Sequence, residues 1–383
     1  MAVSKKIQRY DQYLLRGNLR SEGFERWRYV FNGVSKSTGQ SRVFFVEMYL
    51  VNPAVSPDEA VVAQKSRPVI DMSELISEPV VGGEFSVKPS YISVKCGYFG
   101  KSGKQFNKFI PASQISWNKD TGRMNAGTFE FSSEMLFGSV SITDEELEQN
   151  PELLCCSGEM SWNLTMEKVY SAKSFCQKKG EVWNPSAAKA FYSGIVVCDG
   201  EEFSVEQKTS YGYHDKNWAK SFGKQYYHIS SSRLSDVISG TMLYDSYFVF
   251  ETDSFGKMKF QLQLGEQMYR FDSSAIFKYF KEEHECVQVP SHEGQKEKLH
   301  WSLSIHKGKL IIDIDVYCNA EELFVRNYEI PQGNRTLMKI LSGGEGRGEI
   351  KVFKKVKQNL EMISHIGIYN CISEYGHTEE MGA

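Results

Sequence analysis

The sequence predicts an all-β protein with few short helices, arranged as antiparallel sandwiches or barrels. Three observations favour this class: short runs of β-branched and aromatic residues recur along the chain, turn dipeptides separate these runs, and helical periodicity is scarce. The strand-type runs lie at 27–31, 43–50, 128–131, 194–197, 247–251, 259–264 and 310–316. The turn signals are Asn32-Gly33, Thr38-Gly39, Gly82-Gly83, Thr121-Gly122, Asp199-Gly200, Lys307-Gly308 and Gly343-Gly344.

Two short helices and one domain boundary complete the predicted organisation. Apolar spacing favours a short helix over 273–283, and an acidic run favours another at 144–148. A chain of 383 residues is long for one hydrophobic core, so two domains are expected. We place them at 1–180 and 181–383, with the connection inside the polar stretch 174–190.

Composition excludes several classes of function. Hydrophobic residues make up 41% of the chain and charged residues 24%, as in soluble globular proteins. The net charge is −3, and the densest basic run, Lys351 to Lys357, lies among apolar residues. Such a run is typical of a solvated strand face, so no nucleic-acid partner is expected. The 24 Phe, 20 Tyr and 6 Trp can fill cores or line pockets for flat, lipophilic ligands.

Cysteine spacing and the termini argue for a cytoplasmic protein without a metal. The eight cysteines form no CxxC pair and no zinc-type spacing with histidine. The first ten residues are polar and basic, and no apolar run is long enough to span a bilayer. We therefore expect free thiols in a reducing compartment. A serine hydrolase is not supported either, because the chain has no Gly-x-Ser-x-Gly elbow.

The most informative motif runs from Gly212 to Trp218. On a strand, alternation would place His214, Lys216 and Trp218 on one face and Asp215 with Asn217 on the other. One face then offers a proton donor or acceptor beside an aromatic wall, which suits acid chemistry on an apolar, electron-rich substrate. The alternative is a polar loop in which Asp215 and Asn217 make turn hydrogen bonds.

Two motifs together resemble a known family. The first, Phe24 to Phe31, would alone fit an amphipathic edge strand, but it resembles the phenylalanine-glutamate-glycine-tryptophan-tyrosine signature of tocopherol cyclase-like proteins. The second resembles the Gly-Tyr-His-Asp-His-Asn-Trp-Gly signature of carotenoid 1,2-hydratases, and its Lys216 is closer to the tocopherol cyclase version. Arg26 occupies the position of the glycine in the first signature. Arg28 occupies the position of the tyrosine, and the tyrosine of this chain comes one residue later, at Tyr29. Ala219 stands for the last glycine of the second.

The resemblance implies two lipocalin-like antiparallel β-barrels packed side by side, with an apolar ligand cavity and no metal or organic cofactor. It implies an enzyme that transfers protons to a double bond of a lipophilic, isoprenoid- or polyene-like substrate, as a cyclase, hydratase or isomerase. Such a protein would take a hydrophobic small molecule and contact a membrane surface transiently to collect it. The alternatives are a non-catalytic carrier of a hydrophobic molecule and a sugar-binding or surface-interaction module. The sequence leaves the oligomeric state open.

Residue roles follow from this chemistry. Asp215 or His214 would be the acid, and burial would raise the pKa of the aspartate. Trp218 would stabilise a carbocation, while Lys216 would orient a phenol or carbonyl oxygen of the substrate. A bulge at the motif would let His214, Asp215 and Trp218 meet at one wall of the cavity. The expected catalytic residues are His214, Asp215, Lys216, Trp218 and Tyr244. The expected substrate-binding residues are Glu25, Trp27, Tyr29, Tyr213, Asn217, Tyr226, His228 and Asp245.

Overall fold

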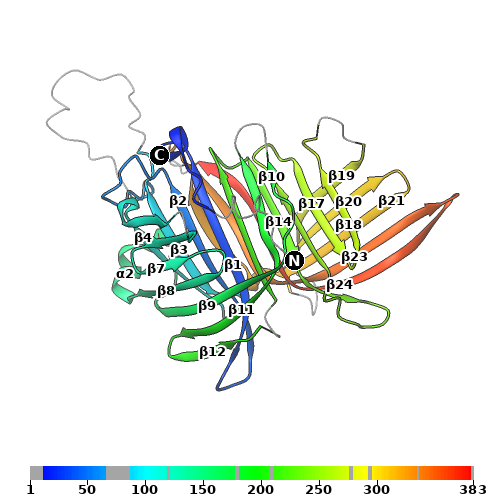
Figure 1. Ribbon diagram of the computed structural model, residues 1–383, viewed down its shortest axis with the longest axis horizontal. Helices are drawn as coiled ribbons and strands as arrows, with labels where there is room; N and C mark the ends of the chain where they lie inside the picture. The colour runs from blue at the N-terminus through cyan, green and yellow to red at the C-terminus, as the bar shows by residue number, and fades with distance from the viewer. Residues whose placement is uncertain are drawn as a thin grey trace.

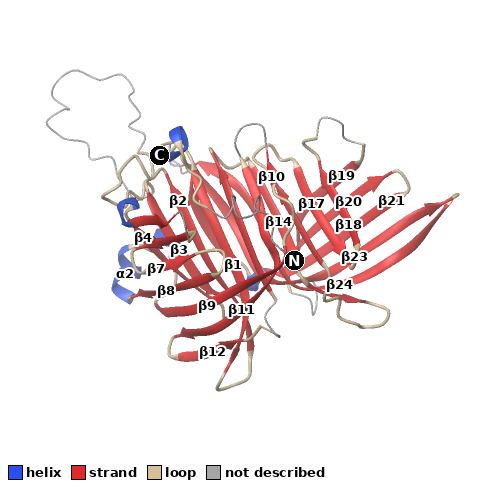
Figure 2. Cartoon of the chain, in the orientation of Figure 1, coloured by secondary structure: helices blue, strands red, loops and turns tan. Residues whose placement is uncertain are grey.

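The computed structural model describes residues 12–65, 87–118, 121–176, 181–207, 211–275, 279–291, 296–333 and 336–380. Almost every regular element in these ranges is a β-strand (Figure 2), which confirms the all-β class. The strands form two antiparallel sheets that lie side by side (Figure 1). The first sheet closes into a barrel and the second is a half-barrel.

The first sheet has thirteen strands and contains the first half of the chain. Along its main path the strands follow the order β4-β3-β2-β1-β12-β11-β9-β8-β7-β6-β5, with β13 paired to β1 and β11, and β10 paired to β11. Their bounds are β1 (Phe24–Ser35), β2 (Ser41–Val51), β3 (Tyr91–Tyr98), β4 (Lys104–Ile110), β5 (Ile115–Asn118), β6 (Arg123–Ala126), β7 (Phe129–Phe131), β8 (Met135–Ile142), β9 (Gly158–Tyr170), β10 (Phe175–Cys176), β11 (Val182–Cys198), β12 (Glu201–Val205) and β13 (Gly212–Ala219).

The second sheet has eleven strands, in the order β18-β17-β16-β14-β24-β23-β21-β20-β19, with β15 paired to β24 and β22 paired to β23. Their bounds are β14 (Gln225–Ser231), β15 (Arg233–Asp236), β16 (Tyr247–Thr252), β17 (Met258–Leu264), β18 (Gln267–Asp272), β19 (Lys281–Val289), β20 (Lys298–Lys307), β21 (Leu310–Asn319), β22 (Phe324–Glu329), β23 (Thr336–Val356) and β24 (Asn359–Glu380).

Helices are short. The α-helix α2 (Asp144–Gln149) confirms the predicted helix at 144–148, and a reciprocal capping box between Thr143 and Glu146 fixes its start. The remaining helical turns are η1 (Gly17–Arg20), η3 (Ala112–Gln114), η4 (Pro151–Leu153) and η5 (Ala320–Glu322). Within the described ranges, no helix combines the length and apolarity needed to cross a membrane.

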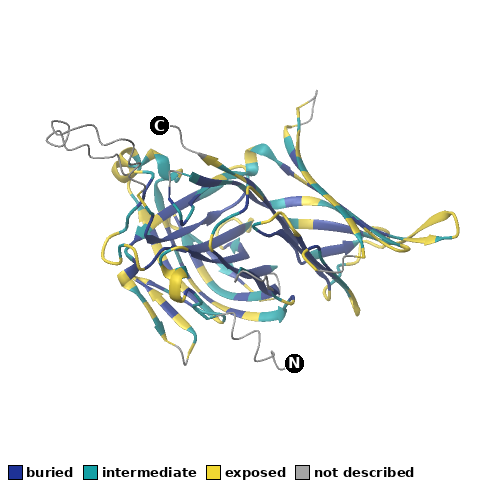
Figure 3. Cartoon of the chain, turned by 90° about the horizontal axis from the view of Figure 1, so that it is seen from above, coloured by how far each residue is buried: buried dark blue, intermediate teal, exposed yellow. Residues whose placement is uncertain are grey.

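Strands β1 and β13 are buried on both faces, and this position explains their composition. The burial patterns of both strands contain almost no exposed position. One face is turned into the barrel, where Trp27, Tyr29 and Trp218 join the main core of the first sheet. The other face meets the second sheet, as the dark region between the two sheets shows (Figure 3). Polar residues on that second face must therefore find partners inside the protein.

The predicted strands are confirmed, but other local predictions need correction. The helix expected over 273–283 is wrong for the described residues of that range, because 273–275 form a turn and 281–289 form strand β19; 276–278 lie outside the described residues. Asn32-Gly33 lies inside β1 and Gly343-Gly344 inside β23, so neither is a turn. Gly82-Gly83 lies outside the described residues. Seven cysteines are free thiols, and the side chain of Cys176 is not described.

Glycines in β23 serve close packing rather than chain reversal. The segment 343–348 carries two register shifts against β24, so the strand is bulged there. A Cβ at Gly344 would lie 2.3 Å from the ring of Phe99, in the first half of the chain. A Cβ at Gly348 would lie 1.8 Å from the carbonyl oxygen of Asp315 on β21. These glycines therefore allow the long strand to pass close to its neighbours.

The connection between the sheets lies later than the polar stretch 174–190 that we expected to link two domains. Strand β11 runs from Val182 to Cys198 inside the first sheet, and β13 completes that sheet at Ala219. The chain enters the second sheet at Gln225 with β14. Strands that follow residue 180 thus contribute to the first barrel before the second sheet begins.

Candidate functional site

The two sequence motifs are direct partners in the sheet. Phe24 to Val30 pair with Ala219 to Tyr213, residue by residue and without a register shift. Alternation therefore holds: Trp27 and Lys216 share the barrel face, whereas Arg28 and Asp215 share the face toward the second sheet. Because no bulge occurs between β1 and β13 in the motif, the expected meeting of His214, Asp215 and Trp218 at one wall is wrong.

The barrel face collects six of the predicted site residues: Glu25, Trp27, Tyr29, His214, Lys216 and Trp218. The ammonium of Lys216 forms an ion pair with Glu25 and lies 5.1 Å from the ring centre of Trp27 and 5.3 Å from that of Trp218. Burial raises the pKa of Glu25, although the charge of Lys216 and hydrogen bonds from Lys216 and the backbone oppose this. This ion pair lies between two indoles, and Glu25 also accepts a hydrogen bond from the backbone N–H of Leu14, so it holds the segment before β1 against the barrel.

His214 is also held by its surroundings. Its Nδ1 lies 2.9 Å from the carbonyl oxygen of Arg28 and therefore carries the proton, and its ring stacks on Tyr29 with 4.2 Å between centres. A shallow hollow of about 200 Å³ at the mouth of the barrel reaches His214 between Trp117 and Phe131. The barrel interior beyond it is filled by aromatic and aliphatic side chains.

The opposite face of β1 and β13 belongs to a layer of buried charges. Directly paired strands of the first sheet place Asp215, Arg28, Glu47 and Lys95 side by side, in alternating sign; we call these the first charge row. Directly paired strands of the second sheet place Lys259, Glu251, His228 and Glu374 side by side; we call these the second charge row. All eight residues are buried, and the two rows face each other.

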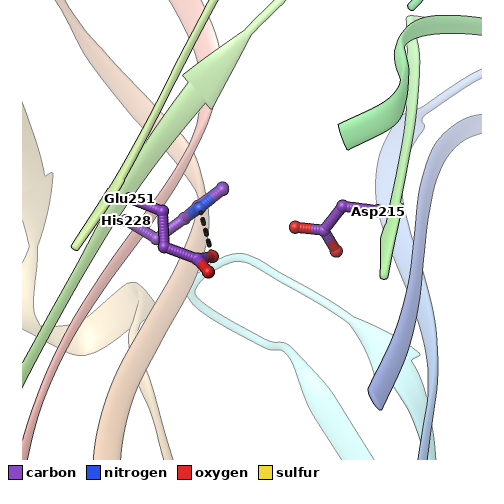
Figure 4. A group of neighbouring side chains, drawn as sticks. All are labelled: Asp215, His228 and Glu251. Atoms are coloured by element: carbon purple, nitrogen blue, oxygen red, sulfur yellow. Dashed lines mark hydrogen bonds and ion pairs between the residues drawn. The ribbon is translucent and has the colours of Figure 1, made fainter. Parts of the chain in front are cut away.

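Arg28 joins the two charge rows. Its Nε lies 3.1 Å from Asp215 Oδ1 and its Nη2 donates to Asp215 Oδ2, so the pair is bidentate. Its Nη1 donates across the interface to Glu374, and its Nη2 lies 3.8 Å from Glu251 Oε2. Three carboxylates thus share one guanidinium. Figure 4 shows Asp215 directed from the first sheet toward His228 and Glu251 of the second.

Asp215 cannot serve as the acid that the sequence suggested. Besides Arg28, its Oδ2 accepts from Trp183 Nε1 at 2.9 Å and from the hydroxyl of Tyr213 at 2.8 Å. Burial alone would raise the pKa of Asp215, but the charge and hydrogen bonds of Arg28 outweigh it and hold that pKa below its usual range. The pKa of Asp215 is thus lowered and not raised as expected, and its carboxylate binds Arg28, Trp183 and Tyr213 together.

Glu374 is ionised for the same reason. Burial opposes its charge, but Arg28, Arg26, His228 and Arg326 lower its pKa to about 2. Its Oε1 also accepts from the hydroxyl of Ser342 at 2.7 Å.

His228 differs from these fixed ions because it can change its protonation. Its Nδ1 lies 3.2 Å from Glu251 Oε2 and its Nε2 lies 2.9 Å from Ser230 Oγ. Burial, and next the positive charge of Arg28, lower the pKa of His228, although Glu251 opposes them. The ring is therefore neutral near pH 7. The rings of Trp183 and Tyr213 lie 5.9 and 5.7 Å from it, centre to centre.

Three pockets reach partners of this histidine from different sides. The Ser230 pocket is a hollow of about 310 Å³, open solvent at its mouth included, and its lining includes the largely buried Tyr213 and Ser230. The Glu181 pocket, about 210 Å³, reaches Glu251 beside Trp183. The Phe222 pocket, about 240 Å³, reaches Asn217 and Tyr226.

Asn217 and Tyr226 connect the Phe222 pocket to the same carboxylate. Asn217 Nδ2 donates to Glu251 Oε1 at 2.8 Å, and the hydroxyl of Tyr226 donates to Glu251 Oε2 at 2.8 Å. Arg26 in turn donates to that hydroxyl at 2.7 Å. The predicted binding residues on this face thus surround Glu251.

Tyr244 and Asp245 do not share this cavity. Tyr244 is 64% exposed, and Asp245 is exposed and accepts from the hydroxyl of Tyr170 at 2.7 Å. Their expected place beside His214 is therefore wrong. They lie in the turn before β16, where the side chains leave the sheet.

The sequence reasoning missed the strongest partners in the layer: Arg28, Glu251, Glu374, Trp183 and Ser230. The sequence did indicate a buried charged layer, because charged residues such as Glu47 in β2 and Lys95 in β3 interrupt otherwise apolar strands. A charged residue in the middle of a strand that is buried on both faces needs a buried partner. Arg26 and Arg28, the departures from the family signature, gave the same signal.

Asp215, His228 and Glu251 could in principle hold a metal, since their ligand atoms lie within 4.8 Å of one another. The electrostatics do not fit. Arg28 Nη2 donates to Asp215 and lies 3.2 and 3.3 Å from the two ring nitrogens of His228. A resident guanidinium cation thus already occupies the space between the ligands, and it repels a second cation.

Glu181 gives the protein a testable pH response. Burial raises the pKa of Glu181 to about 7, despite two hydrogen bonds from Ser254. Since the folded pKa is raised, the stabilisation is complete below pH 4.5 and is lost as pH rises toward 7. In the wild type, the free energy of unfolding should therefore fall by about 3 kcal/mol between these pH values, and Glu181→Gln should abolish this fall. Urea unfolding at pH 5 and 7.5 measures it, with the exposed Glu134→Gln as control; equal pH profiles for the Glu181 variant and the wild type would refute the assignment.

Comparisons with known proteins show only distant likeness. No family model matches the chain, and no curated protein matches its sequence. Among solved structures, it is similar to an AttH candidate from Nitrosomonas europaea, with 10% identity, a TM-score of 0.45 and 96% of each chain covered. It is also similar to kievitone hydratase from Nectria haematococca, with 10% identity, a TM-score of 0.40, and 95% of this chain and 93% of that chain covered. At this degree of similarity, neither protein indicates what the present chain binds or catalyses.

Proposed function

We propose that the protein is a cofactor-independent enzyme that transfers protons on a lipophilic, unsaturated substrate, as a hydratase, cyclase or isomerase. The observation that carries this proposal is the relay Ser230–His228–Glu251, which leads from the Ser230 pocket to a buried carboxylate. The reacting end of the substrate would enter the Ser230 pocket. Val30, Val43 and Ile372 supply apolar contacts there.

The relay favours His228 as a base. Glu251 accepts a hydrogen bond from Nδ1–H, so the lone pair of Nε2 is directed at the hydroxyl of Ser230. A neutral imidazole in this orientation can take a proton from Ser230, and Ser230 can take one from a substrate or a water in the pocket. The imidazolium so formed is a stronger acid than usual because its pKa is lowered, and it returns the proton readily.

This chemistry narrows the substrate class. An isolated alkene needs a strong acid, whereas Asp215 and Glu374 are held ionised by arginine. The double bond should therefore be conjugated to a carbonyl or a phenol, so that a base can start the reaction and an oxygen can carry the developing charge. Tyr213, whose ring borders both the Ser230 pocket and His228, can contact a flat, conjugated group.

The alternative function, a carrier of hydrophobic molecules, would need a preformed apolar lumen. The interior of the first barrel, where such a carrier would hold its ligand, is filled by aromatic and aliphatic side chains of its own core. A surface pocket that leads to a titratable residue supports catalysis better than storage.

Solvent-deuterium exchange tests the proposal without knowledge of the natural substrate. The protein is incubated in D₂O with a panel of lipophilic enones and alkenyl phenols, and mass spectrometry follows deuterium at carbon and addition of water. We expect exchange or hydration with at least one compound class and a loss of roughly a hundredfold in Ser230→Ala. Ser232→Ala is the matched control, because Ser232 lines the same pocket without a hydrogen bond to His228. Equal rates in both variants, or no reaction with any compound, would contradict the relay.

A further inference from the structure

The hairpin of β23 and β24 extends beyond the rest of the second sheet. Its neighbour β21 begins at Leu310, which pairs with Lys354. Beyond that point the two strands pair with each other, as in Lys355 with Leu360, and one hydrogen bond from Lys355 N joins them to the turn before β21. Figure 1 shows the hairpin leaving the body of the molecule, and Figure 3 shows that its end is exposed. Such a projection can reach a surface that the rest of the protein does not touch.

The end of the hairpin is apolar on one strand. Leu360 is 56% exposed, Met362 48% and Ile363 47%. Leu360 and Met362 are two residues apart and share a face, and Ile363 is the extra residue at the register shift opposite Val352 and Phe353. We call Leu360, Met362 and Ile363 the tip patch.

Lysines accompany the tip patch. Lys354, Lys355 and Lys357 are exposed on the other strand and the turn of the hairpin. Lys309 comes from the turn between β20 and β21, which is attached to the hairpin by a hydrogen bond from Lys355 N to Lys309 O at 2.7 Å. Glu361 is the acidic side chain among the residues 354–363. Four lysines thus accompany one exposed apolar patch on the hairpin.

From this combination we propose that the hairpin tip docks on an anionic lipid surface. The lysines would bind the acidic headgroups, and the tip patch would enter the boundary between headgroups and acyl chains. A second copy of this chain fits poorly, because it would present the same four lysines. A nucleic acid would use the lysines but would leave the apolar side chains in water. The proposal is independent of the catalytic relay, which lies in the buried layer between the sheets.

Vesicle sedimentation tests the proposal. The full chain is mixed with phosphatidylcholine vesicles with and without phosphatidylserine. We expect binding to the anionic vesicles that weakens as salt is added. Lys354→Glu/Lys355→Glu/Lys357→Glu should weaken it roughly a hundredfold. Leu360→Ser/Met362→Ser/Ile363→Ser should weaken it at least about tenfold while the salt dependence remains. Circular dichroism and the unfolding midpoint verify that both variants fold.

A matched charge reversal provides the control. Lys36→Glu/Lys101→Glu/Lys220→Glu changes the net charge equally at exposed positions outside the hairpin, and it should bind almost as well as the wild type. Equal loss in this control would mean that net charge, and not the hairpin, drives binding. Unchanged binding of the serine variant would overturn the role of the tip patch. If the protein does not bind vesicles, and light scattering shows dimers that depend on the tip patch, the proposal is overturned and the partner of the tip is a second copy of this chain.

Discussion

Replacing Arg28 with methionine is expected to lower the free energy of unfolding by about 3–5 kcal/mol at pH 7. The methionine fills much of the same volume but removes the charge that Asp215 and Glu374 share. Asp215 would lose its ion pair and keep donors from Trp183 and Tyr213. Glu374 would lose its direct contact with Arg28 and keep Ser342 and Arg326, the latter at 3.6 Å. Urea unfolding followed by fluorescence measures the loss.

The pH dependence of the Arg28 effect tests its cause. The pKa of Glu374 is about 2 in the folded protein and 4.5 as its ordinary value. Because the folded pKa is lowered, the stabilisation is present above pH 4.5 and is lost as pH falls toward 2. Without Arg28 the carboxyls protonate at higher pH, so the penalty of the variant should shrink at pH 3. A penalty that is the same at pH 3 and pH 7 would assign the loss to packing instead of charge.

A surface pair gives the control for this experiment. Lys351 contacts Glu349 on β23, and both side chains are about one third exposed. Lys351→Met should cost less than about 1 kcal/mol, because water screens such pairs. The contrast between the two variants separates the buried layer from ordinary surface electrostatics.

The sequence could predict the arrangement of the β1 and β13 pair because the information is local. Period-two alternation correctly separates Lys216 and Trp218 from Asp215, and the pairing of β1 with β13 preserves that separation. The predicted bulge contradicts this pattern and was invoked only to bring the candidate catalytic residues together. The sequence therefore predicts which face of the strand each residue occupies, but not which face carries the catalytic residues.

The partners across the interface could not be predicted in the same way. Arg28 and Glu374 are 346 residues apart, and their contact depends on how two sheets pack. No local periodicity reports such a contact. The pKa of Asp215 was misjudged for the same reason: burial was foreseeable from the apolar setting, but the four hydrogen bonds from Arg28, Trp183 and Tyr213 were not.

Proximity in sequence also misled the prediction for Tyr244. It lies about one hairpin after the second motif, yet the intervening strands β14 and β15 carry the chain to a turn at the surface. His228, closer to the motif, lies on the buried face of β14 and reaches Glu251 on the adjacent strand. Strand direction, more than distance along the chain, decides which residues meet.

His228→Gln should lower kcat/KM by roughly 10² to 10⁴ on any substrate found by deuterium exchange, with only a modest change in stability. The glutamine amide can donate to Glu251 and accept from Ser230, so it retains both hydrogen bonds of the imidazole. It cannot take up a proton, however, and the relay is interrupted. His300→Gln is the matched control, since His300 lies on the same sheet and bonds a carboxylate, Asp315, at 2.7 Å. The wild-type pH profile gives an independent check: because the pKa of His228 is lowered below 6.5, kcat/KM should stay level at neutral pH and decline only under more acidic conditions. If His228→Gln keeps its rate within a few-fold of the His300 control, the relay does not carry the reaction, and the catalytic group has to be sought on the barrel face at His214.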